Sequence, residues 1–359
     1  MANIDRFFKI VKEKDASDLH FLAGGLPKLR IAGNLEPIPD EPVITHDKLV
    51  ELLFEIIGPS QKAKFLETKD LDFAYGLEGV ARFRCNYLMQ KTGMGAVFRI
   101  IPEKIKTLDD LGLPKAIEKL AHLQSGLVLV TGPTGSGKST TLAAIIDVIN
   151  STYNKHILTI EDPIEFVHQN RTCLITQREI GHDTHGFGNA LRAAGREDAD
   201  VVLVGEMRDL ETISLALTLA ETGQLVFGTV HTNSAAKTID RIVDVFPPDQ
   251  QNQVRIMLSD SLKGIVAQQL LRTKDGKGRV AVNEILFGSQ ALSTVIREGK
   301  IQQIMSLIQA GKGEGMQSID GALTDLVHKG VITADEAYLK AFDKKPFEYL
   351  IKQQQQAAY

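Results

Sequence analysis

The hydrophobic positions in the first hundred residues recur first with a helical and then with a strand-like period. Apolar residues within Ile4–Val11 lie three or four apart, which predicts an amphipathic helix. Apolar and polar residues alternate over Asp18–Leu22, Leu71–Tyr75 and Ala81–Tyr87, as is typical of strands. We also expect a helix over His46–Ile57, ended by Gly58-Pro59, and a strand over Gly95–Ile101. These elements predict a small α/β domain.

The pattern changes in the rest of the chain, where apolar runs are continuous instead of alternating. Strands that are apolar on both sides and separated by helical segments indicate a parallel sheet covered by helices on both faces. The strands expected from these runs are Leu127–Thr131, Ile157–Ile160, Val201–Val204, Leu225–Val230 and Val280–Leu286. The fold class is therefore α/β in both halves of the chain.

These patterns divide the chain into four parts. We expect the N-terminal α/β domain over residues 1–101 and a linker over residues 102–113, where the periodicity stops and charged residues and prolines gather. The second domain then covers residues 114–289. A purely helical C-terminal region with a tail follows over residues 290–359.

Composition narrows the class of protein. The 359 residues are 43% hydrophobic and 24% charged, which excludes a largely disordered chain. The net charge of −4 does not suit a dedicated nucleic-acid binder, whose surface is usually basic. The two cysteines exclude a disulfide framework and a four-cysteine zinc site. We see no signal peptide and no apolar run near the ~20 residues that span a bilayer.

The strongest chemical signal is a glycine-rich segment between a predicted strand and a predicted helix. It matches G-x-x-x-x-G-K-[ST], the phosphate-binding loop of ATP-binding proteins. Glycines let backbone N–H groups converge on phosphate oxygens. Lys138 supplies a positive charge for the terminal phosphates and Ser139 a hydroxyl ligand for Mg²⁺. The candidate ATP-binding residues are Gly132, Pro133, Thr134, Gly135, Ser136, Gly137, Lys138, Ser139 and Thr140.

Acidic residues follow two of the apolar strands. Glu206 comes just after Val201–Val204, in the manner of a Walker B acid, and either binds Mg²⁺ or orients the attacking water. Glu165 lies in a second acidic segment, Thr159–Glu165, and is our candidate for activating water. Asp162-Pro163 within that segment also reads as a simple turn.

Three further residues are candidates by position. His231 directly follows the strand Leu225–Val230, where it can sense the terminal phosphate, although a lone histidine is more often structural. Arg82 and Arg84 share one face of an N-terminal strand. Such arginines are often merely solvated, but a ring-shaped ATPase needs cations delivered across subunits.

Taken together, these motifs resemble the secretion-ATPase (GspE-like) superfamily and, within it, the PilT-type retraction motors of type IV pili. The resemblance runs almost end to end. It rests on the phosphate loop and on Ala16–His20, Arg82–Asn86, Thr159–Glu165, Arg196–Asp198, Val204–Asp209, His231–Ala235, Ser261–Gly264, Gln268–Leu271 and Gly315–Asp320.

The resemblance implies a homohexameric motor with a PAS-like N-terminal domain and a RecA-like ATPase domain. It implies ATP with Mg²⁺ as cofactor and catalytic roles for Glu165, Glu206, His231, Arg82 and Arg84. It also implies a cytoplasmic protein docked on the inner-membrane platform protein of the pilus machine, with a paralogous retraction ATPase as a further partner. No zinc or nucleic acid is expected. Extension motors are longer and usually carry four cysteines, so the resemblance favours retraction and twitching motility.

Some positions depart from the family pattern. Gln224 replaces a usual histidine, Gly195 stands in a helical run, and Ser293 and Thr294 alter a C-terminal motif tied to retraction. Two alternatives stay open. One is a paralogous accessory or regulatory ATPase of the same machine, and the other is a DNA-transfer or secretion ATPase.

Overall fold

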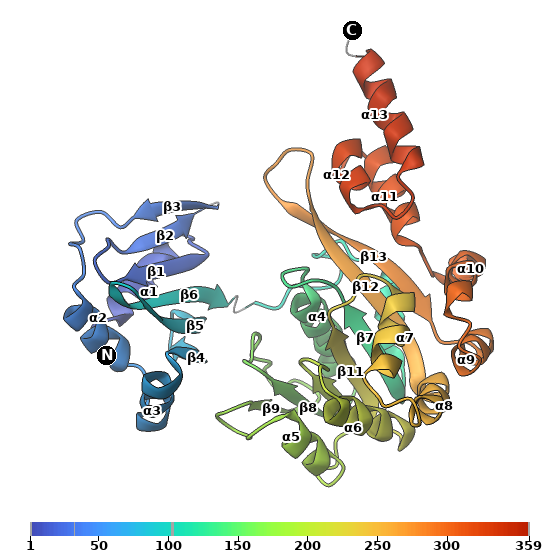
Figure 1. Cartoon of the computed structure of the whole chain (residues 1–359), viewed down its shortest axis with the longest axis horizontal. Coiled ribbons are helices and arrows are strands. Elements are labelled where there is room, and N and C mark those ends of the chain that lie inside the picture. Colours follow the sequence, from blue (N-terminus) through green and yellow to red (C-terminus); the bar gives the residue numbers. More distant parts are fainter. Residues whose placement is uncertain (1, 32, 102–103, 358–359) are drawn as a thin grey trace. The chain divides into compact units, whose positions relative to one another are not determined.

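The computed structural model describes residues 2–31, 33–101 and 104–357 (Figure 1). The chain divides into two compact units. The first consists of Met1–Lys104 together with Pro163–Val167, and the second of Ile105–Asp162 together with His168–Tyr359. The mixed α/β class expected from the sequence is confirmed.

The first unit is an antiparallel sheet with three helices. Its strands are β1 (Asp18–Leu22), β2 (Lys28–Ile31), β3 (Asn34–Pro37), β4 (Asp70–Leu77), β5 (Ala81–Gln90) and β6 (Gly93–Ile101). They lie in the order β3-β2-β1-β6-β5-β4. Its helices are α1 (Asp5–Glu13), α2 (His46–Phe54) and α3 (Pro59–Thr68).

An aromatic cluster holds α1 against this sheet. Phe8 stacks on Phe83 of β5 with ring centroids 4.4 Å apart, and Phe7 meets Phe21 edge-on at 4.9 Å. These side chains are fully buried. The helical spacing within Ile4–Val11 and the alternation along β1 and β5 therefore place one apolar face of each element in the same core.

The helix expected over His46–Ile57 is shorter than predicted, and a second helix follows it. The first helix ends at Phe54, before Gly58-Pro59 is reached, and Gly58 is the N-cap of α3 with Pro59 in its first turn. Proline suits the first turn of a helix because its missing N–H would have no intrahelical partner there.

The second unit is built on a seven-stranded sheet. Its strands are β7 (Gly126–Thr131), β8 (His156–Glu161), β9 (Leu174–Glu179), β10 (Val201–Val204), β11 (Leu225–Val230), β12 (Leu262–Arg272) and β13 (Arg279–Phe287). The order is β13-β12-β7-β11-β10-β8-β9. The sheet is not wholly parallel as predicted, because the edge strand β13 pairs antiparallel with β12. The turn between these two strands is too short for the crossover that a parallel pair needs.

Helices surround this sheet and extend beyond it. They are α4 (Lys138–Thr152), α5 (Phe187–Ala194), α6 (Leu210–Glu221), α7 (Ala235–Asp244), α8 (Gln251–Ser261), α9 (Gln290–Arg297), α10 (Ile304–Ala310), α11 (Ile319–His328), α12 (Ala334–Lys340) and α13 (Lys345–Ala357). Three short 3₁₀ segments are η1 (Lys115–His122), η2 (Ile301–Gln303) and η3 (Gly311–Glu314).

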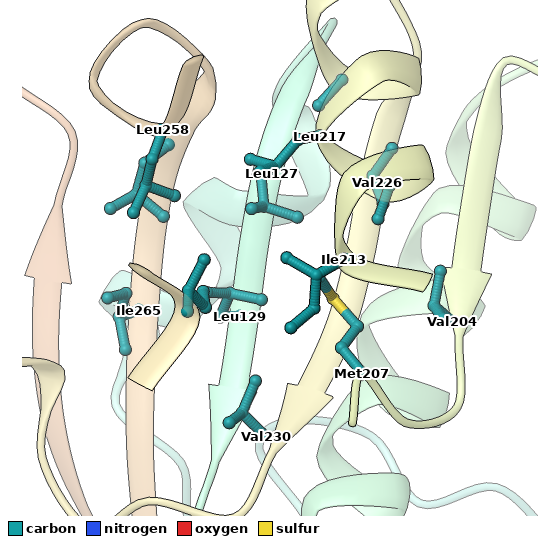
Figure 2. Close-up of a cluster of buried hydrophobic side chains, with 14 of the residues drawn as sticks. Leu127, Leu129, Val204, Met207, Ile213, Leu217, Val226, Val230, Leu258 and Ile265 are labelled. Atoms are coloured by element: carbon teal, nitrogen blue, oxygen red, sulfur yellow. The ribbon is translucent and has the colours of Figure 1, made fainter. Parts of the chain in front are cut away.

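Both faces of the sheet are buried, which explains its continuous apolar strands. Leu127 and Leu129 of β7 face a core that also contains Ile213 and Leu217 of α6 (Figure 2). The alternate residue Val128 faces the opposite core, which includes η1 and α4. The parallel strands are thus covered on both sides, as expected.

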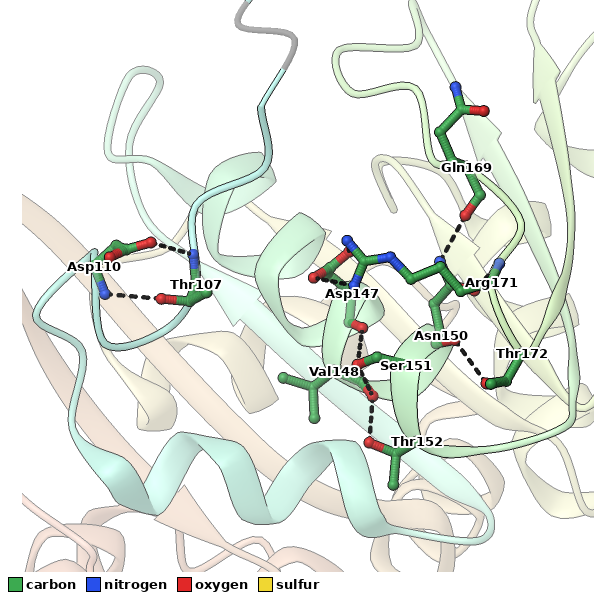
Figure 3. A network of polar contacts seen from close by, with 10 residues as sticks. All are labelled: Thr107, Asp110, Asp147, Val148, Asn150, Ser151, Thr152, Gln169, Arg171 and Thr172. Carbon is green, nitrogen blue, oxygen red and sulfur yellow. Dashed lines mark hydrogen bonds and ion pairs between the residues drawn. The ribbon is translucent and has the colours of Figure 1, made fainter.

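The expected linker differs in extent. Residues 102–103 lie outside the described part of the chain, and residues 105–113 belong to the second unit. Leu108 and Leu113 are buried in its core. Thr107 and Asp110 each donate a backbone N–H to the other's side chain at 3.1 Å (Figure 3). The sequence pattern missed these two buried leucines because charged residues surround them and their spacing fits no regular period.

Polar contacts fix the far end of α4, the helix that follows the glycine-rich loop. Asn150 donates to the carbonyl of Gln169 at 2.8 Å and accepts, through its own carbonyl, from the Thr172 hydroxyl at 2.8 Å. Arg171 forms an ion pair with Asp147 at 3.1 Å (Figure 3). These bonds attach α4 to the segment that leads into β9.

The C-terminal helices α11, α12 and α13 lie beyond the end of β12 and β13 (Figure 1). Leu271 and Val282 of these strands form a separate core with Ile319, Leu323 and Phe347. Within the described residues, no helix combines the length and apolar character needed to cross a membrane.

Candidate nucleotide site

The glycine-rich loop connects β7 to α4 and adopts a backbone that only glycine tolerates. Gly132, Gly135 and Gly137 have φ of +148°, +77° and +85°. A Cβ on Gly132 would stand 2.2 Å from the carbonyl oxygen of Gln268. The loop therefore has the conformation that brings backbone N–H groups together at the start of a helix, where an anion binds.

Lys138 is held against this loop. Its side chain is 9% exposed, and Nζ donates to the carbonyls of Gly132 at 2.9 Å and Pro133 at 3.2 Å. These bonds compensate the burial of the ammonium group. Nζ also lies 3.5 Å from Nδ1 of His231.

His231 bridges Lys138 and Glu206. Nε2 of His231 lies 2.7 Å from Oε1 of Glu206. Because an ammonium group can only donate, its contact with Nδ1 assigns the ring proton to Nε2, which donates to the carboxylate. His231 thus connects Lys138 of the glycine-rich loop to the acid after β10.

The parallel register explains why these residues meet. Val204 of β10 pairs with Gly228 of β11, so both strands end at the same edge of the sheet. The Thr229 hydroxyl donates to the carbonyl of Gly205 at 2.6 Å and fixes the turn that carries Glu206. The positions predicted for Glu206 and His231 at a common strand edge are therefore adjacent.

Two contacts at this edge were not predicted from the sequence. Arg208 donates to Glu206, and this hydrogen bond raises the pKa of the guanidinium. Gln268 lies beneath the loop and bonds to it. Both residues lie in segments that carry the family resemblance, Val204–Asp209 and Gln268–Leu271, but the sequence pattern assigned no contact or role to either side chain.

Glu161 has a supporting position at the end of β8. The residue is 9% exposed, and its carboxylate accepts from the Thr159 hydroxyl at 2.7 Å and from Gln177 at 3.3 Å. These partners hold the end of β8 to β9. Glu161 therefore fixes the conformation at the end of this strand.

Glu165 belongs to the segment Pro163–Val167, which groups with the first unit. There its carboxylate lies 3.7 Å from Arg84 of β5, and both side chains are about two-fifths exposed, at 39% and 43%. An exposed ion pair of this kind stabilises a protein by at most about 1 kcal/mol. Little free energy is therefore lost if Glu165 or Arg84 pairs with another charged group instead.

Arg82 and Arg84 lie on the same face of β5, and Arg84 pairs in register with Arg99 of β6. Arg99 in turn donates to the buried carboxylate of Asp18 at 2.8 Å. The expected arrangement of two arginines on one strand face is present in the first unit.

Two of the residues that depart from the family pattern lie away from the glycine-rich loop. Gln224 precedes β11 and accepts through its side chain from the Thr222 hydroxyl at 2.8 Å. His231 follows the other end of that strand, roughly 20 Å away at the usual rise per residue. Ser293 of α9 donates to the carbonyl of Ser259 of α8 at 2.6 Å. Both side chains thus have local structural contacts.

No group of three or more histidine, cysteine, aspartate or glutamate side chains able to hold a metal ion occurs in the described ranges. The candidate oxygen ligands beside the loop are the Ser139 hydroxyl, on the first turn of α4, and the Glu206 carboxylate, which contacts His231. Hard oxygen ligands of this kind suit Mg²⁺, which usually takes few protein ligands and completes its shell with phosphate and water.

Comparisons with known proteins agree with this geometry. The model of the Type II/IV secretion system protein family matches residues 6–338. The chain is 52% identical over 329 residues to the type IV pilus retraction ATPase PilT of Pseudomonas aeruginosa, covering 92% of this chain and 95% of that protein. It is 38% identical over 348 residues to the type IV pilus ATPase PilU of the same organism, covering 97% and 91%.

Among solved structures, a crystal structure of the pilus retraction motor PilT with bound ADP superimposes with a TM-score of 0.89 at 45% identity. The match covers 97% of this chain and 99% of that one.

Proposed function

Because the chain belongs to the Type II/IV secretion system protein family, we propose that it is an ATP-hydrolysing motor that powers type IV pilus retraction. The observation that carries this proposal is the contact series Lys138, His231 and Glu206 beside the glycine-rich loop. It combines a phosphate-binding cation, a histidine and a carboxylate at one strand edge. The similarity to PilT over nearly the whole length of both chains supports the same activity.

The proposed cofactor is ATP with Mg²⁺. The non-proline residues of Gly132–Thr140 would hold the phosphates through backbone N–H groups, and Lys138 would exchange its carbonyl partners for phosphate oxygens. The Ser139 hydroxyl and Glu206 carboxylate would hold the metal ion. When bound, Mg²⁺ supplies positive charge that offsets the charge developing on the phosphates.

The catalytic residues would divide the work between orientation and charge. Glu165 is proposed to activate the attacking water and Glu206 to orient it or hold the metal shell. His231 accepts from Lys138 and donates to Glu206, so a change at the phosphate would alter its hydrogen bonds. Arg82 and Arg84 would stabilise the negative charge of the transition state from a neighbouring subunit.

A motor of this kind acts through its assembly. We propose a homohexamer that docks on the inner-membrane platform protein from the cytoplasmic side. Movements of the two units driven by ATP binding and hydrolysis would be passed to that protein. A paralogous retraction ATPase is a further proposed partner, and zinc and nucleic acid are not part of the proposal.

The alternative is an accessory or regulatory ATPase of the same machine. The 38% identity to PilU favours it less than the 52% identity to PilT favours a retraction motor. A DNA-transfer or secretion ATPase is less consistent still with the mildly acidic net charge of −4.

An ATPase assay on the purified full-length protein tests the enzymatic part. Lys138→Ala should abolish hydrolysis with the fold intact, because the loop loses the charge that faces the phosphates. The control is Lys91→Ala, an exposed lysine at the turn between β5 and β6. Unchanged turnover in Lys138→Ala would reject the assigned site.

Deletion of the gene tests the biological part. A retraction motor predicts excess surface pili without twitching motility. Loss of pili would indicate an extension motor, and normal pili with normal motility would indicate that retraction does not depend on this protein.

A further inference from the structure

A buried glutamine on β12 joins the two ends of the glycine-rich loop. The side chain of Gln268 is 2% exposed. Its Nε2 donates to the carbonyl of Ser136 in the loop at 2.7 Å. Its Oε1 accepts from the hydroxyl of Thr141 in the first turn of α4 at 2.8 Å.

The backbone of Gln268 contacts the same loop at its beginning. β12 pairs in parallel with β7, with Ala267 opposite Thr131. The residues that follow, Gln268 and Gly132, therefore lie side by side. For this reason a Cβ on Gly132 would meet the Gln268 carbonyl oxygen at 2.2 Å. A Cβ on Gly137 would stand 3.0 Å from Gln268 Nε2. Gln268 therefore lies against the loop at Gly132, Ser136 and Gly137.

The orientation of the carboxamide is fixed from the far side. Nδ2 of Asn283 on β13 donates to Oε1 of Gln268 at 2.9 Å, so that oxygen accepts two hydrogen bonds. Asn283 is fully buried, and its backbone carbonyl accepts from the Gln317 side chain at 2.7 Å. The antiparallel strand β13 and the segment before α11 thus support the glutamine.

We propose that Gln268 is a positioning residue that keeps the glycine-rich loop in its phosphate-binding conformation. This inference rests on the proposed function, since it takes the loop as the nucleotide site. A carboxamide supplies a donor for Ser136 and an acceptor for Thr141 at once, which no apolar or acidic side chain of equal length does. Without it, a buried carbonyl and a hydroxyl lose their partner, and the loop spends less time in the competent form.

The test compares two neighbouring glutamines in the full-length protein. Gln268→Met removes the carboxamide at similar volume, and Gln269→Met makes the same change at the half-buried next residue. Calorimetric titration with ADP and with AMP separates the contribution of the second phosphate. We expect Gln268→Met to raise the Kd for ADP about tenfold or more, with that for AMP changed far less.

In the same comparison, the KM for ATP should rise with the Kd for ADP, and Gln269→Met should stay within about twofold of the parent protein. Equal losses of ADP and AMP affinity would mean a general structural defect and would overturn the proposal. Unchanged ADP binding in Gln268→Met would overturn it as well.

A second variant guards against misfolding of Gln268→Met. Thr141→Val removes a single donor to Gln268 with little change in shape, and should weaken ADP binding in the same direction but less. When Thr141→Val is combined with Gln268→Met, the double variant should bind ADP almost as well as Gln268→Met alone. Both changes remove the same hydrogen bond, from the Thr141 hydroxyl to Gln268. Additive losses would count against the proposal.

Lys138→Ala distinguishes a failure of the proposed nucleotide site from a failure of the positioning role of Gln268. If Lys138→Ala leaves ADP binding intact, the nucleotide site itself is misassigned. If Lys138→Ala loses ADP while Gln268→Met does not, only the positioning role fails.

Discussion

Among single residues, His168 has the most perturbed histidine environment in the described part of the chain. The side chain is 9% exposed, and its Nδ1 is buried with no hydrogen-bond partner among the described residues. Burial lowers the pKa of His168 from 6.5 to about 4, with nearby Asp147 opposing the shift and Arg171 adding to it. His168 is therefore neutral in the folded protein at neutral pH.

His168 should make the protein less stable in mild acid. Below pH 6.5 the unfolded chain takes up a proton that the folded chain refuses until about pH 4, so stability falls as the pH drops through that window. Between pH 7 and pH 5 the loss is about 2 kcal/mol. Urea unfolding of His168→Gln, which cannot gain this charge, should show a smaller pH dependence.

The exposed His185→Gln is the control and should keep the pH dependence of the parent protein. If His168→Gln also keeps it, other groups are responsible for the acid sensitivity.

The residue scale also shows what local sequence can and cannot predict. Glu206 and His231 were identifiable because each directly follows an apolar parallel strand, and such strands end at one edge. Gln268 was not, because its partners Ser136 and Thr141 are more than a hundred residues away in the chain. Gly195 was expected inside a helix, but α5 ends at Ala194 and Gly195 is its C-cap.

At the scale of elements, α6 connects the Glu206 turn to the main core. Its N-cap is Asp209, whose carboxylate accepts from the backbone N–H of Thr212 at 2.9 Å and from its hydroxyl at 2.8 Å. Ile213 and Leu217 on the same helix pack against the sheet (Figure 2). The cap and the apolar face together fix where the helix begins.

Asp209→Ala should lower the free energy of unfolding by ~1 kcal/mol, because the first turn of α6 loses the acceptor for a backbone N–H. Asp209→Asn keeps an acceptor oxygen and should lose much less. Thermal or urea unfolding of the two variants measures the difference. An equal loss in both would point to the charge of Asp209 instead of its hydrogen bonds.

In the second unit, two strands were missed by the sequence pattern for different physical reasons. β9 is mostly half-buried, so its polar residues Thr176, Gln177 and Arg178 hide the alternation. β12 contains Gly264 and the polar pair Gln268-Gln269, whose burial depends on hydrogen bonds to other elements. Periodicity detects apolar burial but not the burial of a satisfied polar group.

At the scale of the whole molecule, the proposed arginines and the Walker B carboxylate of Glu206 belong to different units, whereas Glu165 lies in the first unit with the arginines. Arg82 and Arg84 lie in the first unit and Glu206 in the second. Under the proposed function, a complete site takes its arginines from one subunit and its loop from another. This division makes the site sensitive to the composition of the assembly.

Mixed assemblies should reveal the division. Arg82→Ala and Glu206→Gln should each show little ATPase activity alone. Mixed before assembly, they should recover activity at about a quarter of the sites, where a Glu206→Gln subunit supplies its arginine to an intact loop. Arg99→Ala, which removes a charge from the next strand, is the matched control and should remain active without mixing.

Turnover in the mixture no higher than the average of the two pure variants would rule out action between subunits.

The pairing of β7 sets the order in which this chain is able to fold during synthesis. Gly126 pairs with Leu225 and Leu127 with Leu262, so this interior strand cannot pair until residues about a hundred or more positions downstream have been synthesised. The first unit needs no such delay, because β4, β5 and β6 are successive hairpins and β6 closes on β1. A nascent chain released between β11 and β12 therefore carries a finished first sheet and a second sheet with an open apolar edge, the form that chaperones retain and that aggregates when they do not.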